Sequence, residues 1–180
     1  MVVTGRRDGC IDLLASSSGA LTKTLKGHTG TITSLSFSPD GTQLASTADE
    51  DAHIRLWDIA RGRCTVVLKC KHNGVRASSV QRAIFLDNGE RLLSHCLTPK
   101  EAETADHATR EKEHQEHLDL WDIKSKTFDP LFVMDVDFVF AVSPQLNLFL
   151  VGAMDKLHWV DLKTKKIFAP AKGTKPTTQR

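Results

Sequence analysis

Histidine, serine and aspartate side chains occur together in one stretch of the chain, and this combination can carry out nucleophilic hydrolysis. His28, Ser46 and Asp51 all lie between residues 27 and 68. In a hydrolytic triad the histidine acts as the base, the serine as the nucleophile and the aspartate as the group that orients the histidine. The chain contains no Gly-x-Ser-x-Gly segment of the kind that exposes a serine nucleophile on a sharp turn. We therefore expect no catalytic residues here, and we do not expect the chain to be an enzyme.

A second group of residues with chemical potential lies in the polar segment 98–117. It contains His107, His114 and His117 together with several carboxylates. On a helix, His114 and His117 would share one face and could bind zinc. However, the segment has no cysteine, no fixed four-ligand spacing and many Lys and Arg residues. We expect a charged, partly helical, solvated insert at about 98–117, with no metal site and no cofactor.

Composition limits the remaining classes of function. The chain has 180 residues, a formal net charge of +2 and 40% hydrophobic residues, and its Lys and Arg residues are scattered. Without a clustered basic face, we do not expect nucleic-acid binding. No signal peptide and no apolar run near the roughly 18 residues of a membrane span are present, so we expect a cytoplasmic or nuclear protein with no membrane contact. The cysteines are not in Cys-x-x-Cys spacing and are expected to be reduced and structural: Cys10, Cys64, Cys70 and Cys96.

The elements that must position these side chains are short strands. Between residues 32 and 68, apolar and polar residues alternate over short runs, and turn signals such as Pro39-Asp40-Gly41 separate the runs. A period of two between turn residues is typical of β-strands in antiparallel hairpins. Residues 32–68 are therefore predicted to form a four-stranded antiparallel meander.

The same pattern repeats along the chain. His28 and His72 are 44 residues apart, and Leu14 and Trp57 are 43 apart. Trp121 follows Trp57 by 64 residues, and segment 98–117 accounts for the surplus of about 20. Val160 follows Trp121 by 39 residues. These spacings predict an all-β chain of about four repeats, of which the first lacks its opening strand.

The opening Gly27-His28 and the closing Trp57-Asp58 of the best repeat resemble a blade of the WD-repeat β-propeller family. The resemblance implies an incomplete propeller of about 3.5–4 four-stranded antiparallel blades. Because WD propellers usually close with about seven blades, we expect a fragment, an isoform or one half of a split propeller, completed by a second chain or a missing segment. The expected divisions are a partial first blade at 1–26, the best repeat at 27–70, a third blade with the insert at 71–133, a degenerate fourth blade at 134–169 and a disordered tail at 170–180.

The same resemblance assigns structural roles to the polar residues. A blade of this family is locked by a hydrogen-bonded tetrad, which here would be His28, Ser46, Asp51 and Trp57, with Asp49 as a competitor for the aspartate position. In the third blade Gln115 stands where the aspartate is expected, and the fourth blade has Val160 in place of tryptophan. The partial tetrads are expected at Thr4 and Asp8 in the first blade and at His72, Ser94 and Trp121 in the third.

The family resemblance implies a non-catalytic scaffold for protein–protein interactions. Its partners are expected to bind at exposed loops and turns. Two alternatives remain open: a substrate receptor for a cullin–RING ubiquitin ligase, suggested by Trp121-Asp122-Ile123-Lys124, and a scaffold in an RNA-processing or ribosome-associated complex. The residues expected to contact partners are Arg6, Arg7, His72, Asn73, Arg110, Lys112 and Lys124.

Overall fold

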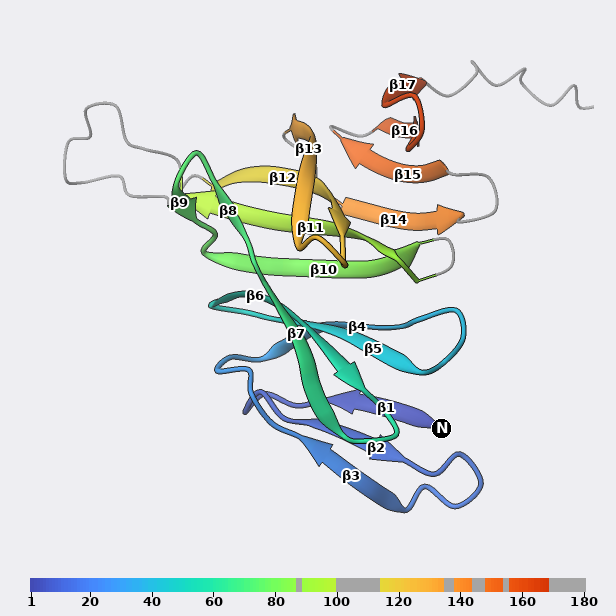
Figure 1. The fold of residues 1–180 in the computed structure, drawn as a ribbon. Helices are drawn as coiled ribbons and strands as arrows, with labels where there is room; N and C mark the ends of the chain where they lie inside the picture. The colour runs from blue at the N-terminus through green and yellow to red at the C-terminus, as the bar shows by residue number, and fades with distance from the viewer. Residues whose placement is uncertain (87–88, 100–113, 135–137, 144–147, 154–155, 169–180) are drawn as a thin grey trace, which may run out of the picture. The chain divides into compact units, whose positions relative to one another are not determined.

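The computed structural model describes residues 1–86, 89–99, 114–134, 138–143, 148–153 and 156–168. Within these ranges the chain forms β-strands and no helix, and hence no helix that could cross a membrane. The strands pair in antiparallel sheets whose order follows the order of the sequence. The expectation of an all-β chain of successive antiparallel sheets is confirmed (Figure 1).

The first compact unit, Met1–Met134, contains three blade-like sheets and a small hairpin. The first sheet has three strands, β1(Val2–Gly5), β2(Ile11–Leu14) and β3(Leu21–Leu25). The second has four, β4(Ile32–Phe37), β5(Gln43–Ala48), β6(Asp51–Asp58) and β7(Arg63–Lys69). The third also has four, β10(Ser79–Leu86), β11(Arg91–Pro99), β12(His114–Asp122) and β13(Thr127–Met134), and it follows the hairpin β8(Lys71–His72) and β9(Val75–Arg76).

The second unit, Asp135–Arg180, contains one four-stranded sheet. Its strands are β14(Phe138–Ser143), β15(Leu148–Ala153), β16(Lys156–Asp161) and β17(Lys166–Phe168). Val160 is 1% exposed, whereas its neighbour Trp159 is 43% exposed. Val160 pairs with Phe149 just as Trp57 pairs with Leu44 in the second sheet. The buried tryptophan position of this sheet is thus filled by valine. The expected tail at 170–180 lies outside the described residues.

Turn chemistry explains where the strands of the second sheet end. Between β4 and β5, Asp40 accepts hydrogen bonds from the Ser38 hydroxyl and the Thr42 backbone N–H at 2.6 and 3.0 Å. Gly41 supplies the positive φ of 70° that this turn requires. Between β5 and β6, Ala48 pairs with Asp51, so only Asp49 and Glu50 make the turn.

The expected boundaries of the charged insert are wrong at both ends. Thr98 and Pro99 belong to β11, and residues 114–117 belong to β12. Pro99 pairs directly with His114, so the sheet extends further than the polar composition suggested. His114 and His117 therefore do not share a helical face, because residues three apart in a strand point to opposite faces. The remainder of the insert, 100–113, lies outside the described residues.

Two apolar clusters hold the first unit together. One joins the first two sheets and contains Ile11, Leu13, Leu44 and Trp57. The other joins the second and third sheets and is formed, among others, by Ile54, Leu56, Val80, Leu92 and Trp121. Cys70 and Cys96 are buried in this second cluster, and all four cysteines are free thiols. Trp57 and Trp121 thus each pack in the layer between their own sheet and the preceding one.

Gly30→Ala is expected to destabilise the first unit by about 3 kcal/mol, because an added Cβ would lie 1.8 Å from the backbone oxygen of Asp49. That turn cannot move away freely, since the Asp49 N–H donates to the Thr31 carbonyl at 2.7 Å. Urea unfolding monitored by tryptophan fluorescence would measure the loss. Gly41→Ala is the control: its Cβ meets open space, and only the left-handed backbone strain of about 1 kcal/mol applies. Equal losses in the two variants would contradict the close approach.

Candidate functional site

A continuous hydrogen-bonded chain of four side chains crosses the second sheet. The Trp57 indole N–H donates to Ser46 Oγ at 2.7 Å, and His28 Nε2 lies 2.7 Å from the same oxygen. His28 Nδ1 lies 2.7 Å from Asp51 Oδ2. Since Ser46 Oγ accepts from the indole, its own proton is donated to His28 Nε2, and His28 Nδ1–H donates to the carboxylate. The arrangement requires a neutral imidazole.

The turn between β5 and β6 decides which aspartate completes this chain. Asp51 is 2% exposed, and its second oxygen accepts a short hydrogen bond from His53 Nδ1. Asp49 instead accepts from the Ser79 hydroxyl at 3.0 Å and so joins the second sheet to the third. Of the two aspartates that the sequence left in competition, Asp51 is the one bonded to His28.

Burial and hydrogen bonding fix the charges within the chain. Burial lowers the pKa of His28 below its ordinary value of 6.5, although the hydrogen bond to Asp51 opposes this shift. Burial alone would raise the pKa of Asp51, but hydrogen bonds from His28 and His53 prevail and hold it below 3.8. At neutral pH the pair therefore consists of a neutral imidazole and a carboxylate.

This geometry is unsuited to nucleophilic catalysis. The Ser46 side chain is fully buried, and its oxygen is engaged by both Trp57 and His28. A serine nucleophile needs a free lone pair directed at a substrate carbonyl. What the arrangement does instead is satisfy polar groups that packing has taken out of water.

The third sheet has a different buried network. Trp121 donates its indole N–H to Ser94 Oγ at 2.9 Å, as Trp57 does to Ser46. His72, however, bonds to Asp119 Oδ2 at 2.9 Å rather than to the serine. The His72 ring stacks on His117 with centroids 3.7 Å apart, and His117 Nε2 lies 2.7 Å from the Thr98 hydroxyl. Burial lowers the pKa of His117 below 6.5, and neighbouring His72 lowers it further.

Asp119 is the residue that the sequence analysis missed. The aspartate was sought six residues before the tryptophan, where Gln115 stands, but Asp119 lies two before it and is fully buried. A strand period of two places His117, Asp119 and Trp121 on one face, and that alternation is the signal that could have identified it. His95 and Glu116, 3.0 Å apart, were also not anticipated.

The first sheet has no comparable buried chain. Thr4 is exposed, and Asp8 is an exposed turn residue that accepts from Arg6 at 2.6 Å and from the Cys10 backbone N–H at 3.1 Å. Leu14 occupies the position that corresponds to Trp57 in the second sheet. Because leucine has no side-chain N–H, this position has no buried donor that needs a hydrogen-bond acceptor. The two residues expected as a partial tetrad are therefore not brought together by a side-chain network.

The expected partner-binding residues lie in different settings. Arg7 and Asn73 are exposed, with Asn73 at the tip of the β8–β9 hairpin. Arg6 is paired with Asp8 and Asp12, and the His72 ring is turned inward with 9% of its side chain exposed. Lys124 is exposed in the β12–β13 turn, at the other end of β12 from the β11–β12 connection. Arg110 and Lys112 lie outside the described residues.

Comparison with known proteins identifies one repeat directly. Residues 19–58 match the family model "WD domain, G-beta repeat". Eukaryotic translation initiation factor 3 subunit I of Scheffersomyces stipitis is 34% identical over 88 residues, which cover 49% of this chain and 23% of that protein. Pre-mRNA-processing factor 19 of Bos taurus is 32% identical over 93 residues, covering 52% of this chain and 17% of that protein. The match thus spans less than a quarter of the length of either relative.

A solved structure shows the same architecture over nearly the whole chain. The β-propeller domain of Cps50 (Swd1) from Myceliophteria thermophila superposes with a TM-score of 0.67 and 19% identity. The match covers 95% of this chain and 52% of that one. At this identity the likeness shows the fold alone.

Ser46→Ala is expected to lower the free energy of unfolding by about 3 kcal/mol, because it leaves both the Trp57 N–H and His28 Nε2 buried without a partner. Ser94→Ala should cost about 1–2 kcal/mol, since the Trp121 N–H loses its acceptor and Cys96 Sγ loses only a weak contact at 3.5 Å. The exposed Ser16→Ala is the matched control and should change stability by less than about 0.5 kcal/mol. Urea titrations of the three variants would decide the order, and equal effects of Ser46→Ala and Ser94→Ala would contradict it.

Stability should fall as the pH is lowered from 7.5 to 5.5. In the unfolded chain His28 titrates near 6.5, whereas in the folded chain its pKa is lower, so the unfolded state binds more protons below pH 6.5. The depressed pKa of Asp51 adds a further loss only below about pH 4. In His28→Gln the dependence between pH 7.5 and 5.5 should be shallower, though not absent, because the pKa values of His95 and His117 are also lowered. An unchanged slope in His28→Gln would refute this assignment.

Proposed function

Because the chain belongs to the WD-repeat β-propeller family, we propose that it is a non-catalytic scaffold that binds other proteins through the loops at one end of its sheets. The observation that carries this proposal is the complete engagement of His28, Ser46 and Asp51 in a buried network. The side chains most suited to chemistry stabilise the blade. Contacts with other molecules are left to the exposed loops.

The direction of the strands determines which loops share one end of a sheet. In an antiparallel sheet, the connection between the second and third strands leaves from the same end as the connection that enters the sheet. The Thr31 carbonyl accepts from Asp49 N–H at 2.7 Å, and Leu97 accepts from Ser78 N–H at 2.7 Å, so the two kinds of connection meet in both the second and the third sheets. Asn73 and the strand ends Pro99 and His114 thus belong to one end of the third sheet.

Among the described residues, Arg7 and Asn73 are the exposed members of this surface. We propose that the insert sequence 100–113, which carries Arg110 and Lys112, contributes to it. The Ile32 N–H donates to the Arg6 carbonyl at 3.1 Å and thereby places the β1–β2 turn beside the start of the second sheet. The ion pairs of Arg6 orient that turn. We infer that His72 supports the hairpin from within, because Asp119 and His117 hold its ring.

The names of the relatives favour one setting for such a scaffold. One is a subunit of a translation initiation factor and another is a pre-mRNA-processing factor. A role in an RNA-processing or ribosome-associated complex, in the cytoplasm or the nucleus, is therefore the preferred form of the proposal. Protein rather than RNA contact is proposed, since the net charge is only +2 and the basic residues are scattered. Completion of the propeller by further blades, from the same or a second chain, belongs to the same proposal.

Replacing residues 100–113 by Asn-Gly tests the loop surface without disturbing the sheet. Pro99 and His114 are already paired, and an Asn-Gly turn closes a two-residue hairpin between paired strands. We expect partners recovered from cell extract by the wild-type chain, identified by cross-linking and mass spectrometry, to bind the replaced chain at least about tenfold more weakly. The urea midpoint should be unchanged, because loop shortening costs little.

Lys124→Glu is the control for this experiment. Lys124 lies at the opposite end of the third sheet, so its reversal should leave recovery of the same partners intact. Full partner binding by the Asn-Gly chain, with normal stability, would overturn the proposed surface. Loss of a cullin–RING adaptor in Lys124→Glu alone would instead favour the ubiquitin-ligase receptor.

A further inference from the structure

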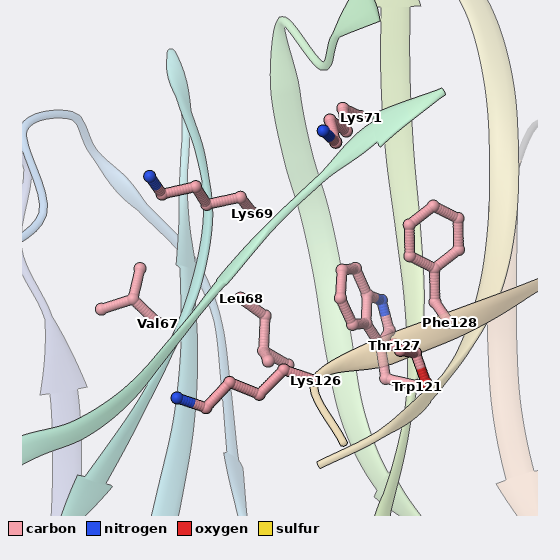
Figure 2. A pocket seen from close by; sticks show the side chains of 8 residues that line it. All are labelled: Val67, Leu68, Lys69, Lys71, Trp121, Lys126, Thr127 and Phe128. Atoms are coloured by element: carbon pink, nitrogen blue, oxygen red, sulfur yellow. The ribbon is translucent and has the colours of Figure 1, made fainter. Parts of the chain in front are cut away.

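A pocket of about 470 Å³ lies between the outermost strand of the second sheet and the third sheet. Figure 2 shows Leu68 of β7 on one side of it and Trp121 of β12 with Phe128 of β13 on the other. Lys69 and Lys71 follow Leu68 along the chain, and Lys126 enters from the β12–β13 turn. Lys71 belongs to β8, in the hairpin that carries Asn73 at its tip, whereas the other lining residues lie outside the loop surface proposed above.

The floor of the pocket is apolar and fixed. Leu68 and Trp121 are each 1% exposed, and the Trp121 indole is held by Ser94. Phe128 packs on Trp121 with ring centroids 4.7 Å apart and on His72 with centroids 5.2 Å apart. Both aromatic rings are thus already occupied by protein neighbours. Such a floor can receive an aliphatic side chain, whereas stacking of a nucleobase needs an exposed aromatic face.

The rim of the pocket carries positive charge. Lys69, Lys71 and Lys126 are exposed, and the described residues that line the pocket include no carboxylate. Among the residues that the structure describes, none of the three ammonium groups has an ion-pair partner. A partner with carboxylates beside its apolar anchor would complement this rim and approach faster.

We propose that this pocket binds an acidic peptide segment of a partner protein, with one leucine-like side chain on the apolar floor and flanking carboxylates against the three lysines. The pocket would bind the peptide through its side chains, between β7 and the third sheet. It is independent of the loop surface, so one can fail while the other stands. Lysine ammonium groups act as flexible point charges, which suits separate carboxylates spaced along a peptide.

The test uses the full chain and a fluorescein-labelled peptide, Glu-Glu-Leu-Glu-Glu, followed by fluorescence anisotropy. We expect the double variant Lys69→Glu/Lys126→Glu to weaken binding by about tenfold or more. The control Lys26→Glu/Lys163→Glu changes the net charge equally at exposed lysines outside the pocket and should weaken binding by less than about twofold. Peptides with the leucine replaced by serine, or with every glutamate replaced by glutamine, should each bind about tenfold more weakly.

Three results would overturn the proposal. Equal weakening in the two charge-reversed variants would show that only bulk charge acts. Equal binding of the leucine and serine peptides would show that the floor takes no anchor. Tighter binding of a single-stranded RNA of about 12 nucleotides, lost in the pocket variant, would assign the surface to nucleic acid instead. Urea midpoints of both variants, expected to match the wild type, separate these outcomes from unfolding.

Discussion

The indole N–H of a tryptophan packed between two sheets is the constraint on which the first unit depends. Trp57 and Trp121 each lie in an apolar cluster that joins neighbouring sheets, and a buried N–H without an acceptor would cost about 1–3 kcal/mol. A serine on the adjacent strand supplies the acceptor in both sheets. The serine hydroxyl then needs an acceptor for its own proton. In the second sheet His28 is that acceptor, and its hydrogen bonds hold the loop that enters the sheet.

The second and third sheets meet this constraint with different charges. Arg55 lies opposite Ser46 in the second sheet, and Asp119 lies opposite Ser94 in the third. Burial, and to a smaller extent the positive charge of Arg55, lowers the pKa of His28, whose carboxylate partner is Asp51 in the turn. In the third sheet the carboxylate already lies beside the serine, and His72 binds it directly. The residue opposite the serine thus differs between the two sheets, and so does the carboxylate to which the histidine is hydrogen-bonded.

Local patterns explain why much of this fold could be predicted from the sequence. The alternation along β4 to β7 and the turn at Pro39-Asp40-Gly41 are properties of short stretches, and their recurrence at a spacing of about 44 residues predicts an all-β array of blades. The insert boundaries were wrong because polar residues of β11 and β12 pair with each other, which composition does not reveal. Asp119 was missed because its partner His72 lies 47 residues away, and a motif position searched alone cannot find such a contact.

Histidine, serine and aspartate can form either a catalytic triad or a buried structural network. The difference here is the fourth residue, Trp57. In a triad the serine oxygen keeps a lone pair for the substrate, whereas here the Trp57 N–H occupies Ser46 Oγ. The indole also fills the space that a substrate would need, because it packs against the preceding sheet. The tryptophan that makes the blade stable therefore also makes its serine inert. A substitution inside this network is expected to alter stability, whereas exposed groups such as Asn73 at a hairpin tip and Lys126 at the rim of a pocket can be changed at little cost to folding.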